Sequence, residues 1–188
     1  MPYRFAVALA ALSATACAAN DAVPPLSPEA PVAPASLPLN DAPIPIKRET
    51  IVLSNSVCFG TCPVYRVTVG PDGHGVFEGE AHVAVIGRRE FSIRPEAYRA
   101  FARHVEPLRP QGSAVSYHTG VAACMPASTD APTTVIKWTH ATGAAEQSFT
   151  LYHGCRSDRA VQLREIVREA PSLLPIGNYV GKPDVGNR

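Results

Sequence analysis

Short runs of β-branched and apolar residues, separated by turn residues, dominate the chain from residue 50 to residue 93. Several of these runs alternate apolar and polar positions, which is typical of strands with one buried face. The predicted strands are residues 50–53, 64–69, 75–79, 81–86 and 90–93. Pro71, Asp72 and Gly73 favour a tight turn between the second and third of these strands. We therefore expect consecutive antiparallel strands in this part of the chain.

The hydrophobic period changes at Pro95, where a helix is expected to begin. Proline suits the first helical position because that residue needs no backbone hydrogen-bond donor. Tyr98, Phe101 and Val105 then recur at helical spacing and form one apolar face. Pro107 ends the helix, since proline cannot continue the backbone hydrogen-bond pattern.

A long irregular connection over residues 107–132 leads to a second predicted hairpin and a final helix. The strands of this hairpin are residues 133–138 and 147–152. Its turn lies around Gly143. Ser157 or Asp158 can cap the last helix, which runs to about Glu169. The sum is an α+β fold, with an antiparallel sheet of about six strands and two helices.

Residues 1–17 form a signal peptide rather than part of the fold. Arg4 supplies a positive charge, an apolar run follows over residues 5–12, and small residues directly precede Cys17. This order resembles a bacterial lipoprotein signal, in which the cysteine is lipidated and becomes the mature N-terminus. The small residues also match the A-x-A pattern of an ordinary signal peptidase, so plain secretion stays open as the alternative.

Prolines recur every few residues between positions 24 and 45. Because proline lacks a backbone donor and biases the preceding residue toward extended geometry, residues 18–47 favour a semi-rigid linker over helix or strand. Such a linker would hold a lipid-anchored domain clear of the membrane surface. The folded domain is then residues 48–176. Residues 177–188, rich in Gly, Pro and Asn, are expected to form a flexible tail.

The formal net charge of +1 lacks the strongly basic field that is typical of nucleic-acid-binding proteins. Nucleic acid is therefore not an expected partner. The expected partners are a membrane, through the lipid anchor, and an envelope protein or a small molecule. The signal segment predicts a location in the bacterial cell envelope, facing the periplasm, at the outer rather than the inner membrane. A soluble secreted or periplasmic protein is the alternative.

Four cysteines remain once Cys17 is assigned to the anchor, and an even set in an exported domain favours disulfides. Cys58 and Cys62 are close enough in sequence to bond if the intervening chain turns. Cys124 and Cys155 flank the second hairpin, so pairing of its strands brings them near each other. We favour the pairs Cys58–Cys62 and Cys124–Cys155 over the crossed connectivities, which stay open.

Cys58 and Cys62 are also candidates for redox or metal chemistry. The pattern Cys-x-x-x-Cys-Pro resembles the copper site of Sco-type chaperones, but that family adds a thioredoxin-like fold that is not predicted here. A thioredoxin-like site needs Cys-x-x-Cys at the start of a helix, whereas a strand follows Pro63. A zinc site needs a second close ligand pair. Structural disulfides are the preferred interpretation, and a thiol-redox or copper-binding pair is the alternative.

No set of residues has the spacing of a catalytic or metal-binding motif. The serines lack the context of a nucleophile elbow, and there is no glycine-rich phosphate loop. The histidines are scattered singly at His74, His82, His104, His118, His140 and His153. We therefore expect no enzyme activity and no cofactor.

The segment Cys-Phe-Gly-Thr-Cys-Pro-Val-Tyr over residues 58–65 carries a family likeness. Together with Asp72-Gly73, Gly79, the Thr-Asp-Ala-Pro run at residues 129–132 and the closing helix, it resembles the bacterial domain-of-unknown-function family 6438. The similarity spans roughly residues 50–170. The resemblance implies a small envelope-associated domain and transfers no activity or catalytic residue. The expected protein is an exported lipoprotein with a small disulfide-stabilised domain, serving as a non-catalytic binding or structural module.

Overall fold

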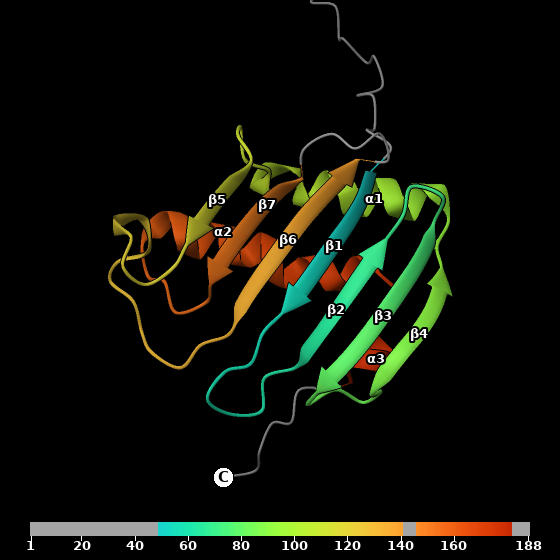
Figure 1. The fold of residues 1–188 in the computed structure, drawn as a ribbon, viewed down its shortest axis with the longest axis horizontal. Coiled ribbons are helices and arrows are strands. Elements are labelled where there is room, and N and C mark those ends of the chain that lie inside the picture. Colours follow the sequence, from blue (N-terminus) through green and yellow to red (C-terminus); the bar gives the residue numbers. More distant parts are fainter. Residues whose placement is uncertain (1–48, 141–145, 182–188) are drawn as a thin grey trace, which may run out of the picture. The chain divides into compact units, whose positions relative to one another are not determined.

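A seven-stranded sheet forms the centre of the domain in the computed structural model, which describes residues 49–140 and 146–181. Its strands are β1 (Glu49–Asn55), β2 (Val64–Val69), β3 (His74–Ala81), β4 (Gly87–Ser92), β5 (Ala114–Tyr117), β6 (Thr133–His140) and β7 (Gln147–Tyr152). They lie in the order β4-β3-β2-β1-β6-β7-β5 (Figure 1). All neighbouring strands are antiparallel except β5 and β7, which are parallel.

Helices cover one face of this sheet (Figure 1). The helices are α1 (Pro95–Val105), α2 (Asp158–Glu169) and the short α3 (Gly177–Val180). Three 3-10 turns accompany them, η1 (Glu106–Leu108), η2 (Ala122–Cys124) and η3 (Ala170–Leu173). Ser157 caps α2, because its hydroxyl oxygen accepts a hydrogen bond from the Ala160 backbone N–H. Among the described helices, none is both long enough and apolar enough to cross a membrane.

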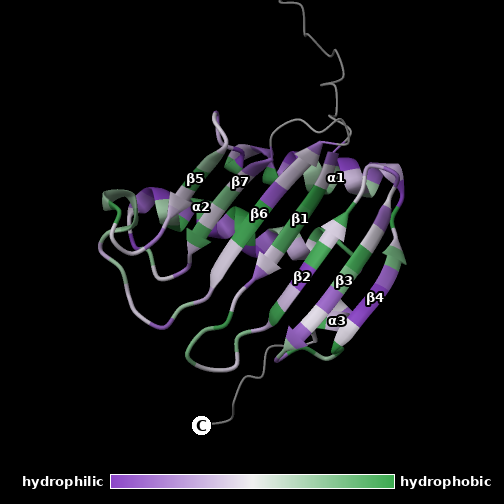
Figure 2. Cartoon of the chain, in the orientation of Figure 1, coloured by the Kyte–Doolittle hydropathy of each residue, from purple (hydrophilic) through white to green (hydrophobic). Residues whose placement is uncertain are grey.

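The core lies between the helices and the face of the sheet that they cover. Ile51 and Leu53 of β1 point into it and are at most 1% exposed. Leu53 lies opposite Val67 of β2 and Ile136 of β6, so the strand register stacks apolar residues on this face. Figure 2 shows hydrophobic and hydrophilic residues alternating along β2 and β3. Phe101 of α1, which is fully buried, closes the core from the helical side.

The α+β fold class is confirmed, and both expected helices and both strands of the second hairpin are present. The sheet has seven strands instead of about six, and it is mixed because of β5. This strand lies inside the connection that the sequence predicts as irregular. It has only four residues and forms because β7 offers a free edge, against which Val115 and Tyr117 pack on the core.

The expected strand over residues 81–86 is wrong. β3 ends at Ala81, and residues 82–85 leave the sheet as bends. Their backbone groups pair with the end of the chain instead, since the N–H groups of Ala84 and Val85 donate to the carbonyls of Val180 and Tyr179. The apolar character of this segment therefore reflects packing beside α3 rather than a place in the sheet.

The expected flexible tail is also wrong at its beginning, because α3 occupies residues 177–180. Tyr179 lies against Phe77 of β3, with 5.4 Å between the ring centroids. An aromatic pair of this kind stabilises the end of the domain. The signal peptide, the linker, the turn around Gly143 and residues 182–188 lie outside the described residues.

Candidate functional site

The loop that joins β1 to β2 carries the cysteine pair that the sequence singles out. We call residues 56–63 the Cys58 loop; it lies at the end of the sheet where β1 stops and β2 begins (Figure 1). Cys58 is bonded to Cys62, with 5.7 Å between their Cα atoms. Gly60 has φ +145°, a conformation that side chains disfavour, and its N–H donates to the Cys58 carbonyl at 3.0 Å. The loop is therefore a compact closed turn.

A groove of about 680 Å³ runs beside the Cys58 loop. Residues from distant parts of the sequence line it, including residues 58–63, 82–84, Asp130, Val180 and Gly181. Phe59 connects two of these parts, because its N–H donates to the Asp130 carbonyl at 3.2 Å. The two cysteines of the loop are half-buried and both face the groove.

Backbone strain is concentrated at this groove. Of the residues that the structure describes, the non-glycine ones with positive φ are His82 at 53° and Asp130 at 66°, and both line it. Such conformations are unfavourable for residues with a side chain and cluster at functional sites. Asp130 belongs to the Thr-Asp-Ala-Pro run that carries the family likeness, whereas the sequence gives no indication that His82 lies at the same place.

Large apolar side chains are exposed around the Cys58 loop. Phe59 is 88% exposed and Val57 69% exposed, while Ile86, on the connection between β3 and β4, is 60% exposed. Phe59 and Val57 lie two residues apart on this rim of the sheet, and adjoining exposed apolar residues are informative, whereas scattered single ones are not. The rim presents an apolar tip next to a partly polar groove.

A buried chain of polar groups lies beneath this rim. The Thr134 hydroxyl donates to Asn55 Oδ1, and His153 Nε2 lies 2.7 Å from the same hydroxyl oxygen. Because Thr134 is 1% exposed, its hydroxyl is sealed from any substrate and the chain is structural. Burial raises the pKa of the neighbouring Tyr65 to about 12. Burial, and then the nearby Arg164 cation, lowers the pKa of His153 from its usual 6.5.

This pKa shift predicts an acid-sensitive fold. Folded His153 holds its proton more weakly than the unfolded chain does, so the stability is fully present above about pH 6.5 and is lost as the pH falls through the folded pKa. His153→Gln keeps a side-chain N–H donor but does not titrate, so its unfolding free energy should fall less between neutral and mildly acidic pH. Urea unfolding at several pH values measures this. His118→Gln, at an exposed position, is the control, and its unfolding free energy should fall as much as that of the wild type. An equally acid-sensitive His153→Gln would refute the assignment.

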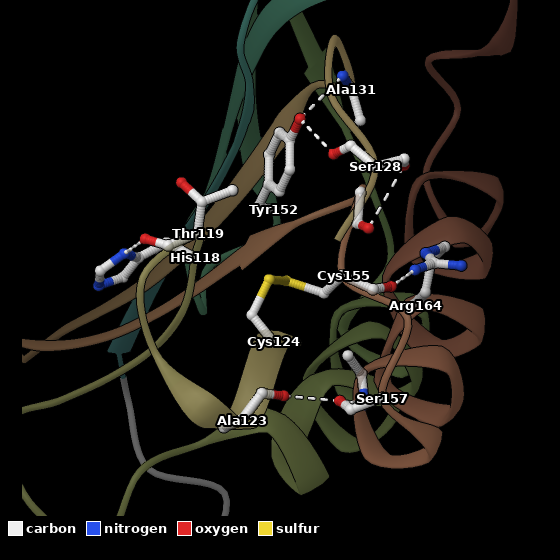
Figure 3. The surroundings of a disulfide bond; sticks show 12 residues. His118, Thr119, Ala123, Cys124, Ser128, Ala131, Tyr152, Cys155, Ser157 and Arg164 are labelled. Carbon is white, nitrogen blue, oxygen red and sulfur yellow. Dashed lines mark hydrogen bonds between the residues drawn. A yellow bond between two sulfur atoms is a disulfide. The ribbon is translucent and has the colours of Figure 1, made fainter. Parts of the chain in front are cut away.

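The second disulfide is sealed in the core. Cys124 and Cys155 are bonded with 4.5 Å between their Cα atoms, and both residues are 0% exposed (Figure 3). Hydrogen bonds surround them: the Ser157 hydroxyl donates to the Ala123 carbonyl at 2.6 Å, and the Arg164 guanidinium donates to the Cys155 carbonyl. This bond therefore ties η2, in the long connection, to the start of α2. Both bonds follow the pairing that the sequence favours.

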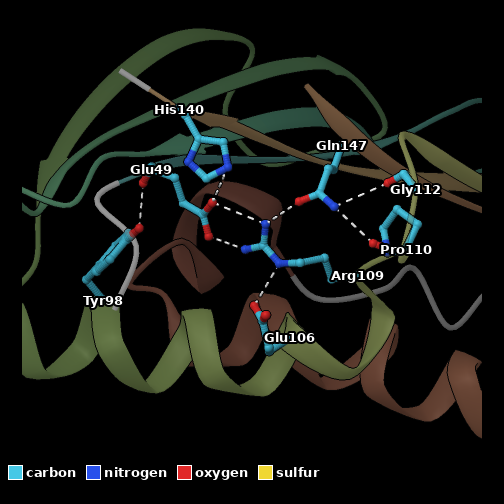
Figure 4. A network of polar contacts seen from close by, with 8 residues as sticks. All are labelled: Glu49, Tyr98, Glu106, Arg109, Pro110, Gly112, His140 and Gln147. Atoms are coloured by element: carbon cyan, nitrogen blue, oxygen red, sulfur yellow. Dashed lines mark hydrogen bonds and ion pairs between the residues drawn. The ribbon is translucent and has the colours of Figure 1, made fainter. Parts of the chain in front are cut away.

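A buried ion pair occupies the opposite end of the sheet (Figure 4). The Arg109 guanidinium binds both carboxylate oxygens of Glu49, and their side chains are 8% and 4% exposed. The same guanidinium donates to Gln147 Oε1 at 2.8 Å and stacks 4.8 Å over the Trp138 ring. Burial and the Glu49 charge raise the pKa of Tyr98, whose hydroxyl donates to the Glu49 carbonyl, to about 12. The Arg109 and Glu49 charges are paired with each other, so this cluster belongs to the packing of the fold rather than to an open binding site.

The other predicted site residues are dispersed. Cys17 lies outside the described residues. His104 donates through Nε2 to the Ile166 carbonyl at 2.8 Å, and His140 Nε2 lies 3.5 Å from Glu49 Oε2. Across residues 49–140 and 146–181, no three His, Cys, Asp or Glu residues are grouped as metal ligands. The Cys58 loop with its groove is thus the place where exposure, strain and reactive side chains coincide.

A protein-family model, described as a domain of unknown function (DUF6438), matches residues 49–173. This span is most of the chain and contains the Cys58 loop, both disulfides and the buried ion pair, so the chain belongs to this family. No curated protein matches the sequence.

Proposed function

We propose that this DUF6438 protein is an exported lipoprotein of the bacterial cell envelope, anchored through Cys17, whose domain is a non-catalytic binding module. It takes its partner at the Cys58 loop and the groove beside it. The observation that carries this proposal is Phe59, an aromatic side chain that is 88% exposed on a loop closed by a disulfide.

A fixed, exposed aromatic residue is suited to binding. Aromatic anchors dominate the energy of many protein interfaces when they enter a pocket of the partner. A loop that is already closed also loses little conformational entropy on binding. The groove adds polar residues, among them His82, Asp130 and Thr61 of the loop. This mixture of an apolar tip and polar surroundings favours a protein partner with an apolar pocket for the Phe59 ring.

The envelope location rests on the N-terminal sequence and on the cysteines. A charged start, an apolar run and small residues before Cys17 match a lipoprotein signal. Disulfides persist in oxidising compartments such as the periplasm, and the domain holds two of them. The outer membrane is the proposed site of the anchor, with a soluble periplasmic or secreted form as the alternative.

The anchor is tested by Cys17→Ser. This variant should move from the membrane fraction to the soluble periplasmic fraction, because the acylated residue is lost. Immunoblotting of cell fractions and the mass of the mature N-terminus measure the change. A wild-type protein that is already soluble, with an unmodified N-terminus, would contradict the lipoprotein assignment.

The binding site is tested by a photo-crosslinking amino acid at position 59, with the same substitution at Val161 as the matched control. Val161 is 41% exposed on α2, away from the Cys58 loop. Position 59 should give a discrete adduct with one envelope protein. With that protein purified, Phe59→Ser should weaken the Kd by about tenfold or more, as for an interface anchor, and Val161→Ser should not.

Three results would speak against this function. The first is equal loss of affinity in the Phe59→Ser and Val161→Ser variants. The second is binding to phospholipid vesicles that depends on Phe59, which would replace the protein partner by a lipid surface. The third is stoichiometric Cu(I) on the reduced Cys58–Cys62 pair, which would favour metal handling.

A further inference from the structure

The two disulfides differ in their access to a reductant. Thiol–disulfide exchange requires the attacking thiolate to reach one of the sulfur atoms. Cys124 and Cys155 are 0% exposed and packed in the core, so their bond is protected as long as the domain is folded. Cys58 and Cys62 are half-buried and line the groove of about 680 Å³, which leaves room for an approaching chain. One bond is thus reachable in the folded protein and the other is not.

The Cys58–Cys62 bond is also not needed to hold the strands of the sheet together. β1 and β2 pair continuously from Ile51 opposite Val69 to Asn55 opposite Tyr65, and β1 pairs with β6 along its whole length. These ladders fix both ends of the Cys58 loop without help from the disulfide. Opening the bond therefore affects the loop while the strands stay in place.

Inside the loop, few interactions remain once the bond is open. The Ser56 N–H donates to the Thr133 carbonyl at 2.9 Å, and the Phe59 N–H to the Asp130 carbonyl at 3.2 Å. Gly60, with its permissive backbone, lies between the two cysteines. An open loop would sample many conformations, so Phe59 would no longer be held in one position beside the groove.

We propose that Cys58–Cys62 is a reversible thiol–disulfide exchange site, opened in the folded protein by an exported dithiol protein of the thioredoxin class. A thiolate of the reductant attacks one sulfur of the pair, forming a mixed disulfide and releasing the other sulfur as a thiolate. The second thiolate of the reductant then breaks the mixed disulfide. Two electrons pass to this protein, which gains two thiols after protonation, and the reductant leaves as a disulfide. Bonds that a reductant can reach in the folded protein are the labile ones used in regulation.

This exchange regulates partner binding at Phe59, a consequence that rests on the proposed function. The closed loop presents Phe59 in a single position, whereas the open loop must be ordered again when the partner binds. The ordering cost weakens the complex. The partner would accordingly bind the oxidised protein more tightly than the reduced one.

The test uses the full-length protein with reduced thioredoxin as the probe. Samples are quenched with acid over time, alkylated and mapped by mass spectrometry. Cys58 and Cys62 should gain two alkyl groups at least ~10-fold faster than Cys124 and Cys155, since only the first pair is accessible. A thioredoxin-class oxidant in its disulfide form should restore the bond, and the circular dichroism spectrum should not change. Equal rates for both pairs, or reduction of Cys58–Cys62 only with loss of the folded spectrum, would overturn the proposal.

A second measurement separates the exchange site from the binding function. Amide hydrogen exchange of the reduced protein, and of Cys58→Ser/Cys62→Ser, should accelerate within residues 56–63 but not in β1 or β2. This result needs no partner, so it stands even if Phe59→Ser leaves partner affinity unchanged, an outcome that would sink only the binding function. Unchanged exchange in residues 56–63 after reduction would overturn the loop opening itself.

Discussion

Replacing Arg109 by methionine is expected to lower the free energy of unfolding by about 3–5 kcal/mol, the range for breaking a buried ion pair. The substitution leaves the Glu49 carboxylate, which is 4% exposed, without the guanidinium that binds both of its oxygens. Gln147 loses a donor at the same time. Methionine occupies much of the space of the arginine stem, so the loss reports the uncompensated charge more than a cavity. Urea unfolding of the purified domain at neutral pH measures it.

A surface pair provides the matched control. Arg99→Met removes the ion pair with Glu96, whose side chains are 43% and 70% exposed, and should cost at most about 1 kcal/mol. Adding Glu49→Gln to Arg109→Met should recover part of the loss, because a neutral amide no longer leaves a charge buried alone. Equal losses at Arg109 and Arg99, or no recovery in the double variant, would show that the buried pair contributes little.

Most of the fold could be predicted because its elements have patterns that are local in sequence. Residues 50–53 in β1 form a run of β-branched and apolar residues, and Tyr98, Phe101 and Val105 repeat at helical spacing along α1. β5 and α3 have four residues each, too few to show a period. They form because the edge of β7 and the ring of Phe77 are already in place, which is information that only the folded sheet contains.

Part of the candidate site could likewise be predicted from local sequence, and part of it could not. The spacing of the two cysteines around Gly60 is a local pattern, and it indicates a closed loop by itself. The walls of the groove come from residues 82–84, Asp130 and Gly181, and no local pattern connects these segments. The ion pair of Glu49 and Arg109 joins residues that are 60 positions apart. Its burial follows from the meeting of β1 with the end of η1, so charge alone could not predict it.

Removing the sealed disulfide is expected to have the second-largest effect on stability. Cys124→Ala/Cys155→Ala should lower the free energy of unfolding by about 3–4 kcal/mol on the chain-entropy estimate, since the bond spans 31 residues. That span contains β6 and β7, and the bond also holds η2 against the start of α2. The variant should therefore exchange the amide hydrogens of η2 and β5 faster than the wild type. Urea unfolding and hydrogen exchange measure the two effects.

Comparing this variant with Cys58→Ser/Cys62→Ser shows whether the length of the chain closed by each disulfide sets the loss of unfolding free energy. The Cys58–Cys62 bond spans four residues, so its removal should cost only about 2 kcal/mol on the same estimate. Both variants should unfold in a single transition with similar denaturant dependence, because the sheet is common to them. A loss at Cys58 and Cys62 as large as that at Cys124 and Cys155 would mean that the Cys58 loop supports the sheet. The loop would then be too costly to open in the folded protein, and a role as an exchange site would fall with it.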